Sequence, residues 1–152
     1  LAGLARSLSE HLIASGGLGR LAAAMSSESA AVERPEAVER PVVIHPHCHG
    51  RATVGTAPDE TVLRALGYRP TTLDAGCCGL AGSFGYAAET AAVSRTIATD
   101  HWLPRLSAAV EKAGPAATLA MDGFSCITQL DQLDGRSHAT VASLILQAIR
   151  RT

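Results

Sequence analysis

Hydrophobic positions along the chain include three short runs that predict strands. Val42-Val43-Ile44 is β-branched and directly follows Pro41, a pattern typical of a buried strand. Two further short runs, over 71–74 and 117–121, predict a second and a third strand. Each of the three runs leads into a segment that contains at least one cysteine.

Longer segments with helical spacing separate and follow these strands. Residues 59–67 begin with acidic side chains and end in glycine, which predicts a helix. The alanine-rich segment 85–113 predicts another helix, and Pro104 is expected to kink or divide it. Its inward positions are predicted to be Val93, Ile97 and Leu103. The last helix has the i, i+3, i+4, i+7, i+8 spacing of one apolar face, formed by Val141, Leu144, Ile145, Ala148 and Ile149.

The predicted order is strand, helix, strand, helix, strand, helix, helix. Alternating strands and helices predict an α/β fold, with a small, mostly parallel sheet and flanking helices. Upstream, residues 1–25 have helical spacing that is interrupted at 15–19, and residues 26–41 are rich in Ser, Ala, Glu and Pro. We therefore expect an N-terminal helix and flexible connection over 1–40, and one α/β domain over 41–152.

Composition narrows the possible functions. The 152 residues are 47% hydrophobic but only 3% aromatic, so we expect a core of Ala, Val, Leu and Ile. The formal charge is −1 and no basic stripe is present, which argues against a nucleic-acid partner. The apolar runs are too short for a transmembrane segment. Because the chain begins with Leu1, we expect a C-terminal fragment of a longer protein.

The candidate site is defined by the four cysteines Cys48, Cys77, Cys78 and Cys126. Each follows a predicted strand, and parallel α/β sheets bind ligands beyond the carboxyl ends of their strands. Adjacent cysteines such as Cys77 and Cys78 seldom bond to each other, and a domain of this size does not need disulfides. We therefore expect reduced thiols at the carboxyl edge of the sheet, available for metal binding or redox chemistry.

Thiolates select zinc, copper(I) or iron–sulfur centres over hard cations, and four of them suffice for a tetrahedral zinc or a cluster. His47 and His49 flank Cys48 and are candidate further ligands. On an extended segment their side chains would point away from Cys48, whereas a turn would allow either to join it.

Glycines surround the adjacent pair of cysteines and allow positive φ and a close approach of the backbone to a bound group. The candidate cofactor-binding residues are Gly76, Gly79, Gly82 and Ser83. The run 79–85 could alternatively bind phosphate at the start of a helix, although it lacks the usual phosphate-binding motifs. Aromatic residues near the cysteine loops belong either to the core or to a wall around a bound centre, and they are Phe84, Tyr86 and Phe124.

Two other interpretations of the cysteines stay open. Cysteine is one of the most buried residue types, so a thiol such as Cys126 could be an inert core side chain, and His47 and His49 could be solvated. A thiol hydrolase that uses Cys78 and His47 is also conceivable, since a nearby imidazole lowers a thiol pKa. It leaves the remaining cysteines without a role.

Three motifs resemble the cysteine-rich CCG domain. They are His-Pro-His-Cys-His at 45–49, Asp-Ala-Gly-Cys-Cys-Gly-Leu-Ala-Gly-Ser-Phe-Gly at 74–85, and Asp-Gly-Phe-Ser-Cys at 122–126. That domain occurs in heterodisulfide reductases, in the iron–sulfur component of glycolate oxidase and in lactate-utilisation proteins. The closer likeness, over about 40–150, is to the C-terminal end of FAD-linked oxidases fused to an iron–sulfur segment. The fuller motif ends in Cys-x-x-Cys, whereas Gln129 stands at the second position here, which argues against a five-cysteine cluster.

The resemblance implies an iron–sulfur electron-transfer domain, or a zinc-binding one, with Cys48, Cys77, Cys78 and Cys126 as ligands. It implies FAD in a missing upstream domain, a ferredoxin-like domain in the same polypeptide, a 2-hydroxy acid as substrate, and an electron acceptor such as a quinone. The isolated fragment would then be inactive, and its location cytoplasmic, including a peripheral position at the inner membrane. The alternative is a structural domain, zinc-bound or metal-free, that mediates contacts within the larger enzyme.

Overall fold

The fold is built on a three-stranded parallel sheet, in a computed structural model that describes residues 5–28 and 40–151. The strands are β1 (Pro41–Ile44), β2 (Arg69–Thr72) and β3 (Thr118–Ala120), in the spatial order β2-β1-β3. Both pairings are parallel, and Val43 of β1 is in register with Thr71 and with Leu119. The predicted α/β class with a small parallel sheet and flanking helices is therefore confirmed.

The central strand β1 is buried along its whole length, which explains its uninterrupted β-branched sequence. Successive side chains of a strand point to opposite faces of the sheet. Val43 accordingly belongs to one hydrophobic cluster, and Val42 and Ile44 belong to another. The sheet thus separates two cores, each covered by its own helices.

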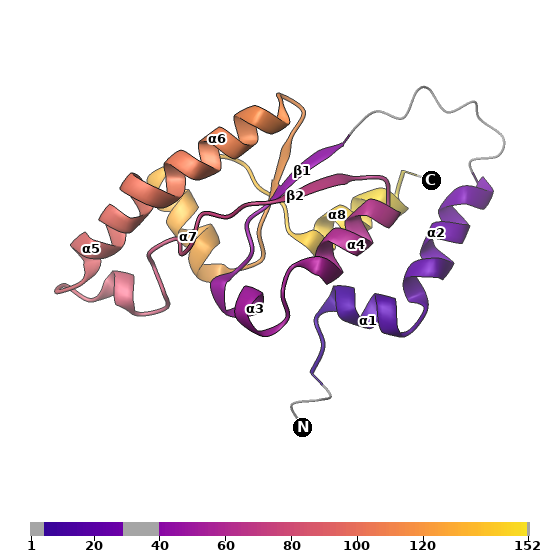
Figure 1. Cartoon of the computed structure of the whole chain (residues 1–152), viewed down its shortest axis with the longest axis horizontal. Coiled ribbons are helices and arrows are strands. Elements are labelled where there is room, and N and C mark those ends of the chain that lie inside the picture. The colour runs from indigo at the N-terminus through magenta and orange to yellow at the C-terminus, as the bar shows by residue number, and fades with distance from the viewer. Residues whose placement is uncertain (1–4, 29–39, 152) are drawn as a thin grey trace.

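Helices from the middle of the chain and one later helix cover the Val43 face. Figure 1 shows them on one side of the strands, and they are α5 (Ala91–Thr96), η4 (Ile97–Trp102), α6 (Leu103–Ala113) and α7 (Phe124–Leu133). The segment η4 has π-helical hydrogen bonding, with a wider turn than an α-helix, which is uncommon and is often found near functional sites. Trp102 and Leu106 are buried in this core together with Cys78 and Cys126.

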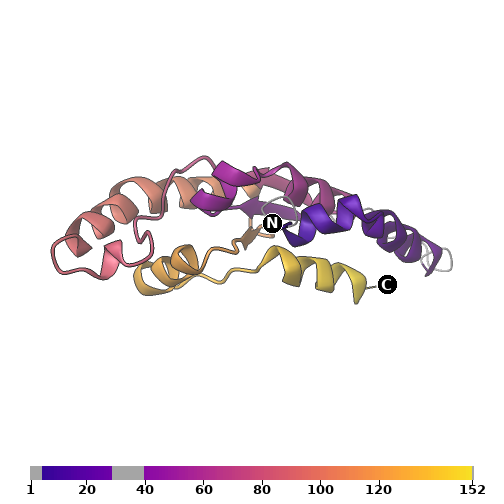
Figure 2. The ribbon, with the colours of Figure 1, turned by 90° about the horizontal axis from the view of Figure 1, so that it is seen from below.

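The opposite face is covered by α4 (Ala57–Ala65) and α8 (Val141–Ile149). Both helices contribute buried aliphatic side chains, and α8 begins with a capping box between Thr140 and Ser143. Two N-terminal helices, α1 (Leu8–Ala14) and α2 (Gly17–Glu28), lie beside α4. Figure 2 shows this group at the end of the molecule opposite to α5 and η3 (Phe84–Tyr86).

Several predicted boundaries differ from the structure. The second strand is β2, displaced toward the N-terminus from 71–74, because an edge strand tolerates Pro70. The helix predicted over 85–113 begins at Ala91, and it changes pitch in η4 before Pro104, which occupies the first turn of α6. The inward position predicted for Val93 is wrong, since this side chain is 51% exposed.

The predicted N-terminal helix and connection over 1–40 lie partly outside the described residues. Helical structure is present, but α2 includes Gly17 and Gly19 and extends to Glu28, beyond the expected start of the connection. Most of that connection, 29–39, lies outside the described residues. In the ranges 5–28 and 40–151, no helix has the length and apolar character needed to cross a membrane.

Candidate thiol site

The four cysteines follow the carboxyl ends of the three strands, as predicted. Cys48 is the first residue of the short helix α3 (Cys48–Thr53) after β1, and Cys126 lies in the first turn of α7 after β3. Cys77 and Cys78 lie in the loop after β2. All four thiols are free of disulfides; Cys48 is exposed, Cys77 is half-buried, and Cys78 and Cys126 are buried.

Contacts between the three segments bring these residues together. Arg51 of α3 forms an ion pair with Asp74 at the start of the cysteine loop, with 2.9 Å between Nη1 and Oδ1. Farther along the loop, the backbone N–H of Gly82 donates to the hydroxyl oxygen of Ser125 on α7 at 3.3 Å. The loop after β2 is therefore attached to the segments that carry Cys48 and Cys126.

Each of the four thiols interacts with at least one other. The Cys126 thiol donates to Cys78, and this hydrogen bond lowers the pKa of Cys78 against the opposing effect of burial. The same contact, together with burial, raises the pKa of Cys126. Cys77 donates to Cys48 at the surface, and the pKa of Cys77 is raised mainly by burial. Cys77 also donates to Cys78, so the buried and the surface thiols form one connected group.

Backbone N–H groups also point at these sulfurs. The N–H of Gly79 donates to the Cys77 sulfur at 3.3 Å, and the N–H groups of Leu80 and Ala81 donate to Cys78. Such donors stabilise a thiolate over a thiol and tune the potential of metal-bound sulfur. These donors therefore favour a negatively charged sulfur at Cys78, whereas at Cys77 the effect of burial exceeds that of the Gly79 donor.

Positive φ angles produce this shape. Gly76, Gly79 and Gly82 have φ of +72°, +95° and +64°, and Ala81 between them has φ of +43°. A Cβ on Gly79 would lie 2.3 Å from the carbonyl oxygen of Ser94, so this glycine is needed for packing against α5. Around Gly76 and Gly82 the corresponding space is open, and the candidate Ser83 is exposed. Their proposed role beside a cofactor stays a prediction.

The two candidate histidine ligands lie on either side of Cys48, where the chain turns from strand to helix. His47 precedes α3 and its ring packs against Gly123, where an added Cβ would lie 2.6 Å from Cδ2. His49 is exposed, and the centroids of the His47 and His49 rings are 6.5 Å apart. The segment therefore adopts the turn and not the extended geometry. In the two described ranges, no three His, Cys, Asp or Glu side chains are arranged around the position of one metal ion.

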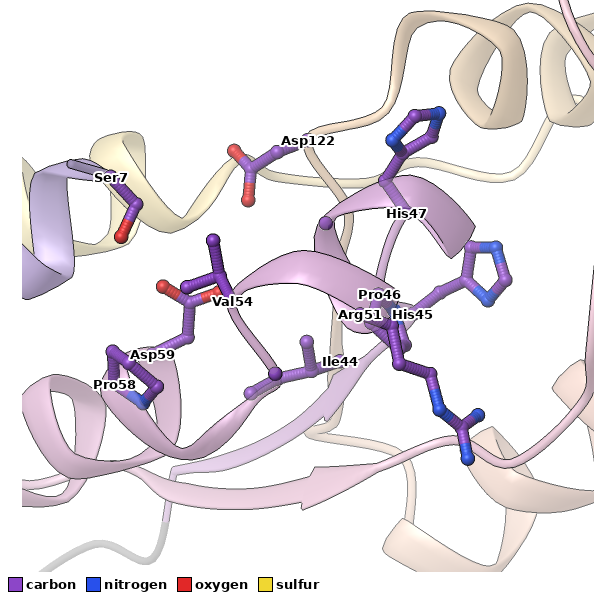
Figure 3. A pocket seen from close by; sticks show the side chains of 12 residues that line it. Ser7, Ile44, His45, Pro46, His47, Arg51, Val54, Pro58, Asp59 and Asp122 are labelled. Atoms are coloured by element: carbon purple, nitrogen blue, oxygen red, sulfur yellow. The ribbon is translucent and has the colours of Figure 1, made fainter. Parts of the chain in front are cut away.

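A separate hollow of about 140 Å³ adjoins the carboxyl end of β1, and none of the cysteines lines it. Figure 3 shows Ser7, Asp59 and Asp122 facing it, with His47 pointing away at its rim. Asp59 accepts a hydrogen bond from the buried Ser9 hydroxyl at 2.6 Å. Burial raises the pKa of Asp122, whose carboxylate accepts from the N–H of Val141. These carboxylates thus have structural partners at the ends of helices.

One buried histidine near the site was not among the predicted ligands. His45 follows β1 on the Val43 face, its ring packs against Trp102, and Nδ1 accepts from the indole N–H at 3.3 Å. Burial, followed by the charge of His47, lowers the pKa of His45 to about 4. The neutral imidazole then carries its proton on Nε2, which has no hydrogen-bond partner among the described residues. The alternation in 43–45 was the only sequence signal for its burial.

The aromatic residues near the thiols are not core residues. Phe124 is 79% exposed and Tyr86 is 57% exposed, while Phe84 is half-buried. The core interpretation is therefore wrong for Phe124 and Tyr86. Both lie at the surface, on segments that are joined by the hydrogen bond between Gly82 and Ser125.

Comparisons with known proteins give one informative likeness. No family model matches the chain, so the expected cysteine-rich domain family stays a prediction, and no solved structure matches it. Over 108 residues, 69% of this chain, the sequence is 32% identical to a D-2-hydroxyglutarate dehydrogenase from Pseudomonas putida. The matched stretch covers 10% of that enzyme, so the chain spans about a tenth of its relative's length. The chain is thus similar in sequence to a limited segment of a D-2-hydroxyglutarate dehydrogenase.

Proposed function

We propose that the chain is an electron-transfer domain of an FAD-linked oxidoreductase acting on a 2-hydroxy acid, and that its four cysteines bind an iron–sulfur cluster. The observation that carries the proposal is the meeting of thiols from three strand ends in one connected group. The likeness to a D-2-hydroxyglutarate dehydrogenase supports the reaction class.

The chemistry of the donor set fits a cluster. All four candidate ligands are soft thiols that are free of disulfides. Backbone N–H groups from 79–81 already donate to two of the sulfurs. Hydrogen bonds to sulfur and burial are two of the means by which a protein sets a cluster's potential.

Oxidation of a 2-hydroxy acid to a 2-oxo acid releases two electrons and two protons, which FAD can accept. A bound cluster would supply one-electron transfer between that flavin and an acceptor such as a quinone. Within this chain, Cys78 and Cys126 would hold the centre away from water, while Cys48 and Cys77 lie toward the surface. No residue of the chain is assigned to the removal of hydrogen from substrate.

Metal and sulfide analysis of the anaerobically purified full chain tests the proposal. We expect iron and acid-labile sulfide in equal amounts, together with visible charge-transfer absorbance. The double variant Cys77→Ser, Cys78→Ser should lose both. Met121→Leu is the matched control, because it removes a buried sulfur from the same core without changing a candidate ligand. Stoichiometric zinc without iron, or iron retained in the double variant, would contradict the proposal.

A second candidate function is a structural domain that forms contacts within the larger enzyme. The exposed Phe124 and Tyr86 favour it, since exposed aromatic side chains are enriched at protein interfaces. In the intact enzyme, Phe124→Ser should then weaken assembly, while the double cysteine variant should keep full dehydrogenase activity. Loss of electron transfer to the acceptor in the double variant would exclude this second function.

A further inference from the structure

Gln129 is a buried polar residue in the thiol half of the molecule. It is 2% exposed and lies on α7 one turn after Cys126, so the two side chains share a face of the helix. Its amide nitrogen Nε2 donates to the carbonyl oxygen and to the hydroxyl oxygen of Ser94, each at 3.4 Å. The amide donor of Gln129 is therefore directed at Ser94 of α5.

Ser94 in turn lies against the cysteine loop. An added Cβ on Gly79 would lie 2.3 Å from its carbonyl oxygen, and one on Gly85 would lie 2.7 Å from its hydroxyl oxygen. The loop backbone therefore lies so close to Ser94 at Gly79 and at Gly85 that neither position has room for a side chain. Ser94 is itself buried and has little room to move.

Two positions of α7, one turn apart, thus act on the cysteine loop, one by direct contact and one through Ser94 of α5. Cys126 interacts directly with Cys78. One turn later, Gln129 donates a hydrogen bond to Ser94, and Gly79 packs against the carbonyl oxygen of that serine. Because Cys78 and Gly79 are adjacent, a sliding or rotation of α7 along the loop would disturb both contacts together.

We propose that Gln129 is a positioning residue which, through Ser94, fixes the cysteine loop against α7 and sets the separation between Cys78 and Cys126. This inference rests on the proposed function only in naming the same thiol site, since the contacts belong to the chain without metal. In the longer Cys-x-x-Cys motif, a second cysteine stands at the position of Gln129. The inference gives this position a different role here, because Gln129 hydrogen-bonds to Ser94 and is not a ligand.

The rate of disulfide formation between Cys78 and Cys126 measures their separation. We expect diamide, which takes two electrons and two protons from a thiol pair, to cross-link them more slowly in Gln129→Met, by about fivefold. Methionine keeps the length and volume of the side chain and removes the donor. Cross-linking between Cys48 and Cys77, which involves no residue of α7, should be unchanged. Each pair is quantified by peptide mass spectrometry on the reduced, metal-free full chain.

Two controls separate positioning from general loss of stability. Thr128→Val removes a hydrogen bond to Phe124 on the same helix without touching Ser94, and Leu63→Ala destabilises the other core. Neither should alter the ratio of the two cross-linking rates. An unchanged ratio in Gln129→Met, or an equal change in either control, would overturn the proposal.

Ser94→Ala keeps the carbonyl acceptor and removes the hydroxyl, so it decides the question if Gln129→Met does not fold. We expect a smaller loss, about twofold, confined to Cys78 and Cys126; no loss would overturn the proposal. Iron and sulfide analysis of the same samples distinguishes the two claims. Wild-type protein without iron but with a selective Gln129 effect would refute the cluster and support the positioning role.

Discussion

The two faces of β1 carry cores of different character. On the Val42 and Ile44 face, aliphatic side chains of α4 and α8 pack together, and the polar side chains buried with them or beside them are hydroxyls: Tyr68 donates to a backbone carbonyl, and Ser9 donates to Asp59 of α4. On the Val43 face, the core contains two thiols and is accompanied by the buried polar residues His45, Ser94 and Gln129.

The two faces of the sheet therefore contribute differently to the molecule, one mainly to its stability and the other to its chemistry. Apolar burial is non-directional, so the aliphatic face stabilises the fold without specifying one arrangement of polar atoms. Buried polar groups cost free energy unless they are hydrogen-bonded, and they therefore require defined positions. On the Val43 face they surround Cys78 and Cys126. We infer that this face determines the geometry of the thiols, while the other face holds the sheet together.

The largest effect is expected from Leu63→Ala, because Leu63 is fully buried in the aliphatic core. Its truncation should lower the free energy of unfolding by about 3 kcal/mol. Urea denaturation measures this loss, and Arg64→Ala on the exposed side of α4 should change it by about 0.5 kcal/mol or less. If Leu63→Ala also altered the cross-linking of Cys78 with Cys126, the two faces would not be independent.

The second effect is a pH dependence that belongs to the thiol face. His45 has a folded-state pKa of about 4, below its usual value of 6.5, so the unfolded chain binds the extra proton first as pH falls. The contribution of neutral His45 to the free energy of unfolding is thus fully present above pH 6.5. It should decrease by up to about 3 kcal/mol as the pH falls toward 4. His47 and Arg51 face this imidazole and disfavour its charge.

Urea denaturation between pH 7.5 and 4.5 measures this dependence. His45→Gln removes the titrating group and keeps an acceptor for the Trp102 indole, so its stability should vary less over this range. His47→Gln is the control, since it leaves the buried imidazole in place. Parallel curves for wild type and His45→Gln would show that the thiol face does not exclude a charge at this position.

The sequence predicts most of the sheet, for physical reasons that act locally. The β-branched run 42–44 has its side chains buried on both faces, and the strand-end rule places all four cysteines at one edge. By contrast, α3 could not be predicted, since none of its residues is buried and no hydrophobic period marks it. The position of Val93 was wrong because the helix containing it starts later and changes pitch at η4.

The candidate site divides in the same way. Cysteines are recognisable by residue type and spacing, and the structure brings them together in one connected group. His45 and Gln129 carry no local signal that separates them from surface residues. Their burial depends on Trp102 and Ser94, which lie far from them in sequence, and only the folded chain reveals these contacts.

A third prediction compares two glycines of the cysteine loop. Gly79→Ala places a methyl group against the Ser94 carbonyl at positive φ, whereas Gly76→Ala meets open space at a similar φ. We expect Gly79→Ala to cost about 2 kcal/mol more than Gly76→Ala, because only the former adds a steric clash to backbone strain. Thermal and urea unfolding of the two variants measure the difference. Equal costs would show that the loop is not pressed against α5.

The smallest effect is expected on the aliphatic face, from Tyr68→Phe. The hydroxyl donates to the backbone carbonyl of Leu144 at 2.9 Å, joining the start of β2 to α8. Removing it keeps the ring in place and should cost about 1 kcal/mol, the usual net value of one hydrogen bond. The denaturant midpoint should fall at an unchanged slope, because the surface exposed on unfolding is the same. A loss as large as that of Leu63→Ala would mean that a polar contact organises this face as well, and the contrast between the two cores would fail.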